Sequence, residues 1–337
     1  MIRFRIPAKP GTGKRACGLS FFNEGGSVAK AFATYEQQIE KLGGDGLLVE
    51  DAAYAEQQLR DIGYFALVNG YKRLLRDPST GRYGAGASFS DLVALYEFDS
   101  SLRELFSHSL TYVERKMRSA VSYSFCDKHG EAQSAYLDPA NYSGSRKHAR
   151  GIAKLVRMLD ALAKRNTDHD YIVHYRTSHG NVPLWVLVNA TTFGQMSKMY
   201  SFLAPSEKAA VSRQFAHANE KELEQFLKVL VLFRNVCAHG EQLLTHRTHS
   251  VIPDTNLHRK LGIGKKGNQY SQGKSDLFAV VIALRHLLPK DRFLAFRKGL
   301  TRLIDGYLEK SRAIGRDALL ASMGFPQNWE RITRFKL

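Results

Sequence analysis

The stretch FSDLVALYEFDSSLRELFSHSLTYVERKMRSAVSYSF occupies residues 89–125 and contains the longest periodic pattern in the chain. Apolar and small residues recur in it at intervals of three and four positions: Leu95, Phe98, Leu102, Leu105, Phe106, Ser109, Val113, Met117, Ala120 and Val121. This spacing places one buried stripe along a helix. The pattern predicts one very long helix, from Phe89 to about Lys128, or two consecutive helices.

Helical patterns also dominate the rest of the sequence. Thr34 and Gln37 have capping-box spacing, which predicts a helix that begins there and ends at the glycine pair 43–44. Other helices are expected at about 50–60, in a basic segment at 145–166, from Pro205, at 220–239, and two or three times after residue 275. Residues 131–145 are expected to form a loop, and 240–274 a long polar connection. Because strand-type alternation is scarce, the predicted class is all-α.

The domain organisation follows from the same pattern. Residues 1–28 are expected to form a weakly ordered, basic N-terminus, and residues 29–337 a single helical domain. The glycine-rich stretch GTGKR at 11–15 lacks the full spacing of a phosphate-binding loop.

The charge balance indicates the kind of partner. The 337 residues include 49 Lys and Arg against 32 Asp and Glu, a net charge of +17, which favours binding to a polyanion such as nucleic acid. No apolar run approaches the roughly 20 residues that span a bilayer, so no membrane attachment is expected. The three separated cysteines, Cys17, Cys126 and Cys237, argue against a disulfide framework and fit a reducing cytoplasm.

Metal and cofactor sites are not expected. His169 and His174 are five positions apart, which misses the spacing of a helical zinc site, and no third ligand accompanies them. We therefore predict neither a metal nor a cofactor. Trp185 and Phe193 are expected in the hydrophobic core rather than in base stacking.

The stretch VLFRNVCAHGEQLL at 231–244 places polar residues at the end of an apolar helix. On a helical wheel measured from Leu223, Arg234 lies at roughly 20°, inside the apolar arc, while Asn235 and His239 lie at roughly 120° and 160°. A buried guanidinium needs a partner or an anionic ligand, because its desolvation costs several kcal/mol. The long arginine side chain could bring all three polar groups together.

Two interpretations fit these residues. As a catalytic set, histidine takes or gives a proton at the 2′- or 5′-oxygen of RNA, arginine holds the phosphate, and asparagine orients either of them. As a structural set, Arg234 pairs with a buried acid such as Glu114 at the end of the helix.

The spacing Arg234-Asn235-x-x-x-His239 is similar to the R-x4–6-H motif of HEPN ribonucleases. Several blocks in order, covering roughly residues 31–333, resemble the Abi-like family of abortive-infection proteins, in the AbiD/AbiF group: TYEQQIEKL, GLLVED, LRDIGYFALVNGYKRLL, SFSDLVALYEFDSSLRELF, VERKMRSAVSY, PLWVLVNATTFGQMSKMY, LFRNVCAHGEQLL and MGFPQNWE. The chain departs from many relatives just after the motif, where Gly240, Gln242, Leu244 and Thr245 replace a second His, an Arg and a Trp-Asn pair.

The resemblance implies a HEPN-like helical bundle, bacterial antiphage defence and RNA as the ligand. It implies a homodimer with a composite cleft, in which Arg234, Asn235 and His239 form a metal-independent endoribonuclease toxin that leaves 2′,3′-cyclic phosphate ends. The alternative is an RNA-binding module that holds a structured noncoding RNA without cutting it. The basic segments supply the expected phosphate contacts, which are Lys147, Arg150, Arg247, Lys265 and Lys266.

Overall fold

The structure is a computed structural model that describes residues 31–164 and 169–337. The expected basic N-terminus at 1–28, with GTGKR and Cys17, lies outside the described residues. The all-α prediction is confirmed, because the described residues are mostly helical and their named strands are two residues long each. The prediction of one domain over 29–337 stays a prediction.

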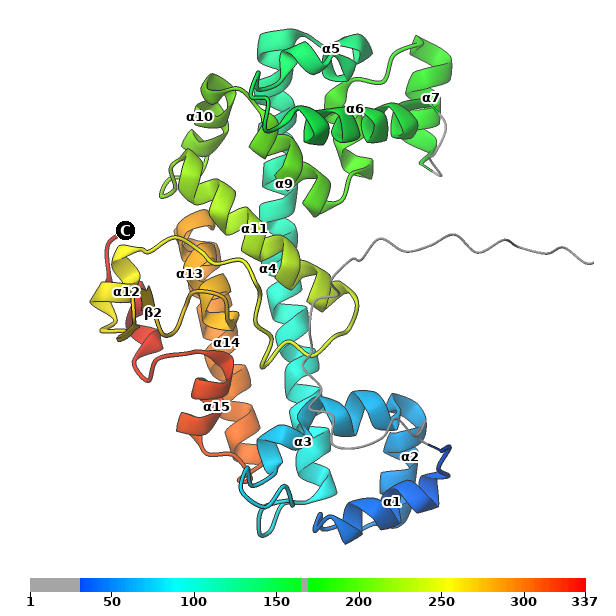
Figure 1. The fold of residues 1–337 in the computed structure, drawn as a ribbon, viewed down its shortest axis with the longest axis vertical. Helices are drawn as coiled ribbons and strands as arrows, with labels where there is room; N and C mark the ends of the chain where they lie inside the picture. Colours follow the sequence, from blue (N-terminus) through cyan, green and yellow to red (C-terminus); the bar gives the residue numbers. More distant parts are fainter. Residues whose placement is uncertain (1–30, 165–168) are drawn as a thin grey trace, which may run out of the picture.

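One long helix, α4 (Phe89–His129, 41 residues), runs through the molecule, and the other helices pack along it (Figure 1). Ser88 and Asp91 form a capping box at its start, and Gly130 ends it with a φ of 83°. Its apolar stripe is buried, including Leu102, Phe106 and Val113, each with no exposed surface. The stretch at 89–125 therefore forms one helix and not two.

The N-terminal helices pack against the first part of α4. Thr34 and Gln37 form the expected capping box, and Arg76 and Tyr83 form an isolated antiparallel bridge that closes the turn-rich segment before α4. The elements are α1 (Tyr35–Gly44), α2 (Ala52–Ile62), the π-helical turn η1 (Phe65–Asn69) and α3 (Gly70–Leu75).

A second group of short helices surrounds the other end of α4 (Figure 1). Its elements are α5 (Gln133–Leu137), η2 (Pro139–Asn141), α6 (Ala149–Lys164), α7 (Asp170–His179), α8 (Leu184–Leu187), η3 (Val188–Ala190), α9 (Phe193–Phe202) and α10 (Pro205–Arg213). The expectation of a loop at 131–145 was wrong in part, because α5 and η2 form there. Buried Tyr136 holds α5 in place, since its hydroxyl donates to the Val182 carbonyl at 2.8 Å.

The C-terminal half crosses and covers the middle of α4. Helices α11, α13 and α14 all contact α4, and the buried residues form one hydrophobic cluster. The elements are α11 (Glu220–Ala238), α12 (Asn256–Lys260), the hairpin strands β1 (Lys265–Lys266) and β2 (Gln269–Tyr270), α13 (Leu277–Leu287), α14 (Lys290–Lys310), α15 (Arg316–Met323) and η4 (Trp329–Arg334). Across residues 31–164 and 169–337, no helix is long and apolar enough to cross a membrane.

The connection at 240–274 is packed against the core despite its polar composition. Leu243, Leu244, Ile252 and Leu257 have no exposed surface. Lys274 closes the connection on itself, because its ammonium donates to the Ile252 carbonyl and pairs with Asp254 at 2.6 Å. This segment therefore carries its own fixed structure.

Candidate functional site

The end of α11 holds the residues that the sequence singles out. Asn219 and Glu222 form a capping box at the start of α11, and His239 is the C-terminal capping residue. Gly240 has a φ of 66°, which favours glycine, and the Glu241 amide donates to the Val236 carbonyl at 3.1 Å across the helix end. The glycine thus ends the helix directly after His239.

Arg234 lies in the contact between α11 and α4. Its Nε donates to the Glu114 carboxylate, with 3.2 Å between Nε and Oε2. The Glu114 side chain is only 4 % exposed, whereas the Arg234 side chain is 34 % exposed. The predicted pairing of Arg234 with Glu114 is therefore confirmed. Within the described residues, the Nη1 and Nη2 groups of Arg234 donate no hydrogen bond, so they remain open to an anion.

A second guanidinium shares the same carboxylate. Arg118 Nη2 lies 2.6 Å from the other oxygen of Glu114, and it also donates to the Thr191 carbonyl. Two cations thus face one buried anion, which leaves a local excess of one positive charge. Arg118 follows Glu114 by four residues and so lies on the same face of α4, but it was not among the residues predicted for the site.

Asn235 and His239 lie on the outer surface of the last turn of α11. Both are exposed, and neither side chain has a hydrogen-bond partner in the described part of the chain. Their separation of four positions places them next to each other on one face. The predicted meeting of all three polar groups is not seen, because the Arg234 side chain turns inward to Glu114 while Asn235 and His239 face outward.

A buried acid fixes the chain just beyond His239. Asp99 has no exposed surface, and its carboxylate accepts from the Leu243 and Leu244 amides, with 2.6 Å from the Leu244 nitrogen. It also accepts from the Tyr71 hydroxyl at 2.8 Å and pairs with Arg103. Burial raises the pKa of Asp99, against the effect of these donors. The acid ties the segment just after α11 to α4. The sequence signal that could have revealed this contact is the charged pair Asp99 and Arg103 inside the apolar stripe of α4.

The model of the Abi-like protein family matches residues 57–245, which is more than half of the chain. The chain belongs to the Abi-like family. The match includes Asp99, Glu114 and Arg118 and continues through Arg234, Asn235 and His239. No curated protein and no solved structure matches the chain.

The five basic residues predicted to contact phosphate lie apart in this Abi-like protein. Lys147 and Arg150 are exposed at the start of α6, whereas Lys265 and Lys266 are exposed on the β1 strand at the opposite side of the molecule (Figure 1). The Lys265 ammonium lies 4.8 Å from the centre of the Tyr270 ring. Arg247 donates to the Ser322 carbonyl at 2.9 Å and to the carbonyl of His246, so its guanidinium joins two segments of the fold. These residues do not form one patch, and their binding to RNA stays a prediction.

Two aromatic residues were predicted to lie in the hydrophobic core, and only one of them does. Phe193 is 1 % exposed, as predicted for a core residue. The prediction for Trp185 was wrong, because this side chain is 46 % exposed on α8. Helix α8 has only four residues, and Leu184, Val186 and Leu187 bury its inner face, which leaves Trp185 on the outer face.

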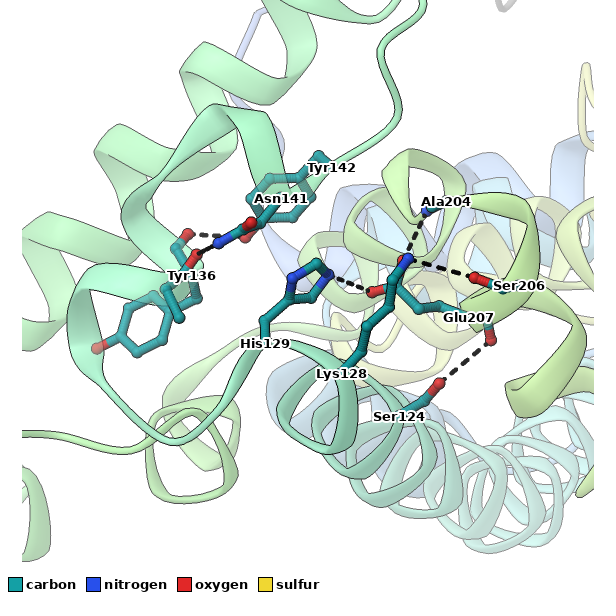
Figure 2. Close-up of polar contacts among 10 residues, drawn as sticks. Ser124, Lys128, His129, Tyr136, Asn141, Tyr142, Ala204, Ser206 and Glu207 are labelled. Carbon is teal, nitrogen blue, oxygen red and sulfur yellow. Dashed lines mark hydrogen bonds and ion pairs between the residues drawn. The ribbon is translucent and has the colours of Figure 1, made fainter.

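A second polar cluster, which was not predicted from the sequence, joins α4 to α10 (Figure 2). Glu207 is 2 % exposed and accepts from the Ala204 amide at 3.1 Å, which caps α10. The Glu207 carboxylate also lies 3.2 Å from His129 Nε2 and 3.4 Å from Lys128 Nζ. These contacts fasten α10, and with it the start of α11, to the last turn of α4. The cluster therefore fixes the start of α11, at the opposite end of this helix from His239.

Proposed function

We propose that this Abi-like protein is an antiphage endoribonuclease of the HEPN type, in which Arg234, Asn235 and His239 cut RNA without a metal. The observation that supports it most is the exposed pair Asn235 and His239 at the same helix end as Arg234, whose Nη groups donate no hydrogen bond within the described residues. A titratable ring, an amide and a cation that has unused donors are the groups that phosphodiester transfer requires.

The proposed reaction uses RNA as its own nucleophile. His239 removes the proton of a 2′-hydroxyl, and the 2′-oxygen attacks the neighbouring phosphorus. A bond forms between phosphorus and the 2′-oxygen, and the bond to the 5′-oxygen breaks, which leaves a 2′,3′-cyclic phosphate. The departing 5′-oxygen takes a proton from a general acid, and Arg234 stabilises the charge on the phosphate oxygens.

Each chain has one Arg-Asn-x-x-x-His sequence, while this reaction needs both a base and an acid. A homodimer supplies a second His239 to the same cleft. The exposure of His239 in the single chain fits this proposal, because a second copy can cover and complete the site.

The test compares wild-type protein with His239→Ala on a mixed RNA substrate, each with and without EDTA. We expect cleavage by the wild type to be unaffected by EDTA, and the variant to lose about 10²- to 10⁴-fold in rate, the usual contribution of a general acid or base. Product ends should be 2′,3′-cyclic phosphate and 5′-hydroxyl. His249→Ala is the matched control, because His249 is also exposed but lies outside the motif.

The results decide between two functions. The pairing of Arg234 with Glu114 favours the second candidate, an RNA-binding module that holds a structured noncoding RNA, because the guanidinium is already part of a structural ion pair. Tight RNA binding without cleavage by either protein would establish that function instead. Cleavage that EDTA stops, equal in both proteins, would exclude His239 as the catalytic residue.

A further inference from the structure

The middle of α4 carries more cations than the fold neutralises. Between residues 105 and 126 this helix has one acid and three Lys or Arg residues, which are Glu114, Arg115, Lys116 and Arg118. The acid is already shared, because its two oxygens contact Arg118 at 2.6 Å and Arg234 at 3.2 Å. Arg115 is exposed and forms no hydrogen bond or ion pair in the described part of the chain. This part of α4 therefore presents positive charge that is available to an external anion.

Helix geometry spreads these cations over the side of α4 that adjoins the α11 site. With Arg118 at 0° on a helical wheel, Arg115 lies at roughly 60° and Lys116 at roughly 160°. Ser119, at roughly 100°, is exposed like Arg115, so the middle of this arc faces solvent. Arg118 and Arg234 contact the same carboxylate, so the arc begins beside the α11 site. The cations thus lead away from Arg234 across α4.

Aromatic rings hold the cations at the far side of this arc. The guanidinium of Arg292, in the first turn of α14, lies 4.4 Å from the centre of the Tyr112 ring on α4. The Lys116 ammonium lies 4.5 Å from the centre of the Phe215 ring. Among the described residues, neither cation has an acidic partner. Because the rings already restrict these side chains, ordering them around an anion costs less conformational entropy.

An exposed ring lies further along the same side of α4. Tyr123 is 69 % exposed and lies at roughly 140° on the same wheel, within the arc of cations. It follows Arg115 by about 12 Å along the helix axis. Its side chain has no ring or hydrogen-bond partner within the part of the chain that the structure describes. Exposed rings beside a row of cations are typical of surfaces that bind single-stranded nucleic acid, on which bases stack while phosphates contact the cations.

We propose that one face of α4 binds single-stranded RNA and leads it to the α11 site. This α4 face consists of Arg115, Lys116 and Tyr123, together with Arg292 from α14. Phosphates lie against the three cations, and an unpaired base stacks on Tyr123. The inference rests on the proposed function, because it identifies the substrate of the α11 site as a single strand. A duplex keeps its bases stacked on each other, so Tyr123 offers it no comparable contact.

The first test measures how RNA affinity depends on salt. The probe is a short, fluorescein-labelled 2′-O-methyl RNA strand, which keeps the phosphates but lacks the 2′-hydroxyl that the proposed cleavage needs. Fluorescence anisotropy gives its Kd for the full chain over a series of KCl concentrations. The double variant Arg115→Gln/Arg292→Gln should bind about tenfold more weakly or worse. Its slope of log Kd against log salt should fall by about 1.4, because each phosphate contact to a single strand contributes about 0.7.

Arg302→Gln is the matched control for these substitutions, because Arg302 is an exposed arginine on α14 outside the α4 face. The control should keep the wild-type Kd and slope. A double variant with the wild-type slope, or a wild-type chain that does not bind the probe at low salt, would overturn the proposal. Thermal unfolding of each variant is measured in parallel, and no loss is expected at these exposed positions.

The second test concerns the unpaired base. Tyr123→Ala should weaken binding of the single strand about fivefold or more, the lower end of the contribution of one stacked base, and should leave the Kd of the same sequence in a duplex unchanged. Phe65→Ala is the control, because Phe65 is an exposed ring, 76 % accessible, on η1. Equal losses for single strand and duplex, or equal Kd values in the Tyr123 and Phe65 variants, would exclude stacking on the α4 face.

These measurements separate the α4 face from the proposed cleavage, because the probe lacks the nucleophile of that reaction. Normal probe binding by the Arg115→Gln/Arg292→Gln variant, with cleavage of ordinary RNA lost in His239→Ala, would overturn the α4 face and leave the proposed function intact. Weakened binding by that double variant and by Tyr123→Ala, in a chain that cuts no RNA, would support the α4 face and overturn the proposed cleavage.

Discussion

Arg234 shows how far residue-level reasoning reaches. The wheel placed a guanidinium among apolar residues, and elementary electrostatics then required a partner. Glu114 is that partner at 3.2 Å, as the structural interpretation expected. The second cation, Arg118, was missed because its role depends on the packing of α4 against α9 and η3, which brings the Thr191 carbonyl to it. Contacts between segments so far apart follow from the tertiary fold, and no local pattern reveals them.

The shared carboxylate gives the first stability prediction. Glu114→Gln removes the anion that faces both Arg118 and Arg234, which leaves two guanidiniums next to each other. We expect the free energy of unfolding to fall by about 3 kcal/mol, the lower end of the range for breaking a buried pair, because both arginines reach solvent. Urea unfolding monitored by circular dichroism measures this change in the free energy of unfolding.

Glu241→Gln is the control for this prediction, because Glu241 is exposed and forms no ion pair in the described part of the chain. The control should lose less than about 0.5 kcal/mol. Equal losses in the two variants would mean that the buried carboxylate does not stabilise the α4–α11 contact.

At the scale of elements, helices with local signals were predicted and those without were missed. The capping box at Thr34 correctly predicts the start of α1, and Gly240 correctly predicts the end of α11. Helix α5 has five residues and no side-chain cap, so it exists through contacts such as Tyr136 with Val182. Trp185 was misassigned for a related reason, since the exposed side of a four-residue helix depends on what packs against it.

The N-terminal cap of α13 gives a pH prediction. Asp276 accepts from the Ala279 and Gly273 amides, but it is 4 % exposed, and burial raises its pKa to about 6. An acid whose pKa is raised by folding holds its proton more tightly in the native state, so stability falls as pH rises from about 4 to 6. The titration of Asp276 alone should lower the free energy of unfolding by about 3 kcal/mol between pH 4 and pH 6.

Asp276→Asn isolates this contribution, because asparagine keeps an acceptor for the cap and does not titrate. The stability difference, wild type minus variant, should decrease between pH 4 and pH 7 and stay level above pH 7. Denaturant unfolding at several pH values measures the difference. A difference that increases with pH would show that the backbone donors and Arg247 outweigh burial.

At the scale of the whole molecule, the single chain presents Asn235 and His239 on an open surface, while Arg234 turns towards Glu114. A net charge of +17 would attract a polyanion such as RNA from any direction, and the basic side chains predicted from the sequence to contact phosphate are spread over opposite sides. Charge alone therefore would not define where the proposed cleavage of RNA takes place. A second chain that covers His239 would define it, because the reacting phosphate would then lie between two histidines.

The final prediction concerns this proposed dimer. Light scattering should give about twice the chain mass of 37.9 kDa at micromolar concentration. If the cleft needs His239 from both subunits, equal mixing of wild type with His239→Ala leaves activity only in dimers of two wild-type chains. After random exchange of subunits, the mixture should have about one quarter of the activity of wild-type protein at the same total concentration. If each site worked independently, it would have about one half. A monomer that retains full cleavage activity on dilution would exclude the composite cleft, even if His239 proves catalytic, because one histidine would then serve both proton transfers.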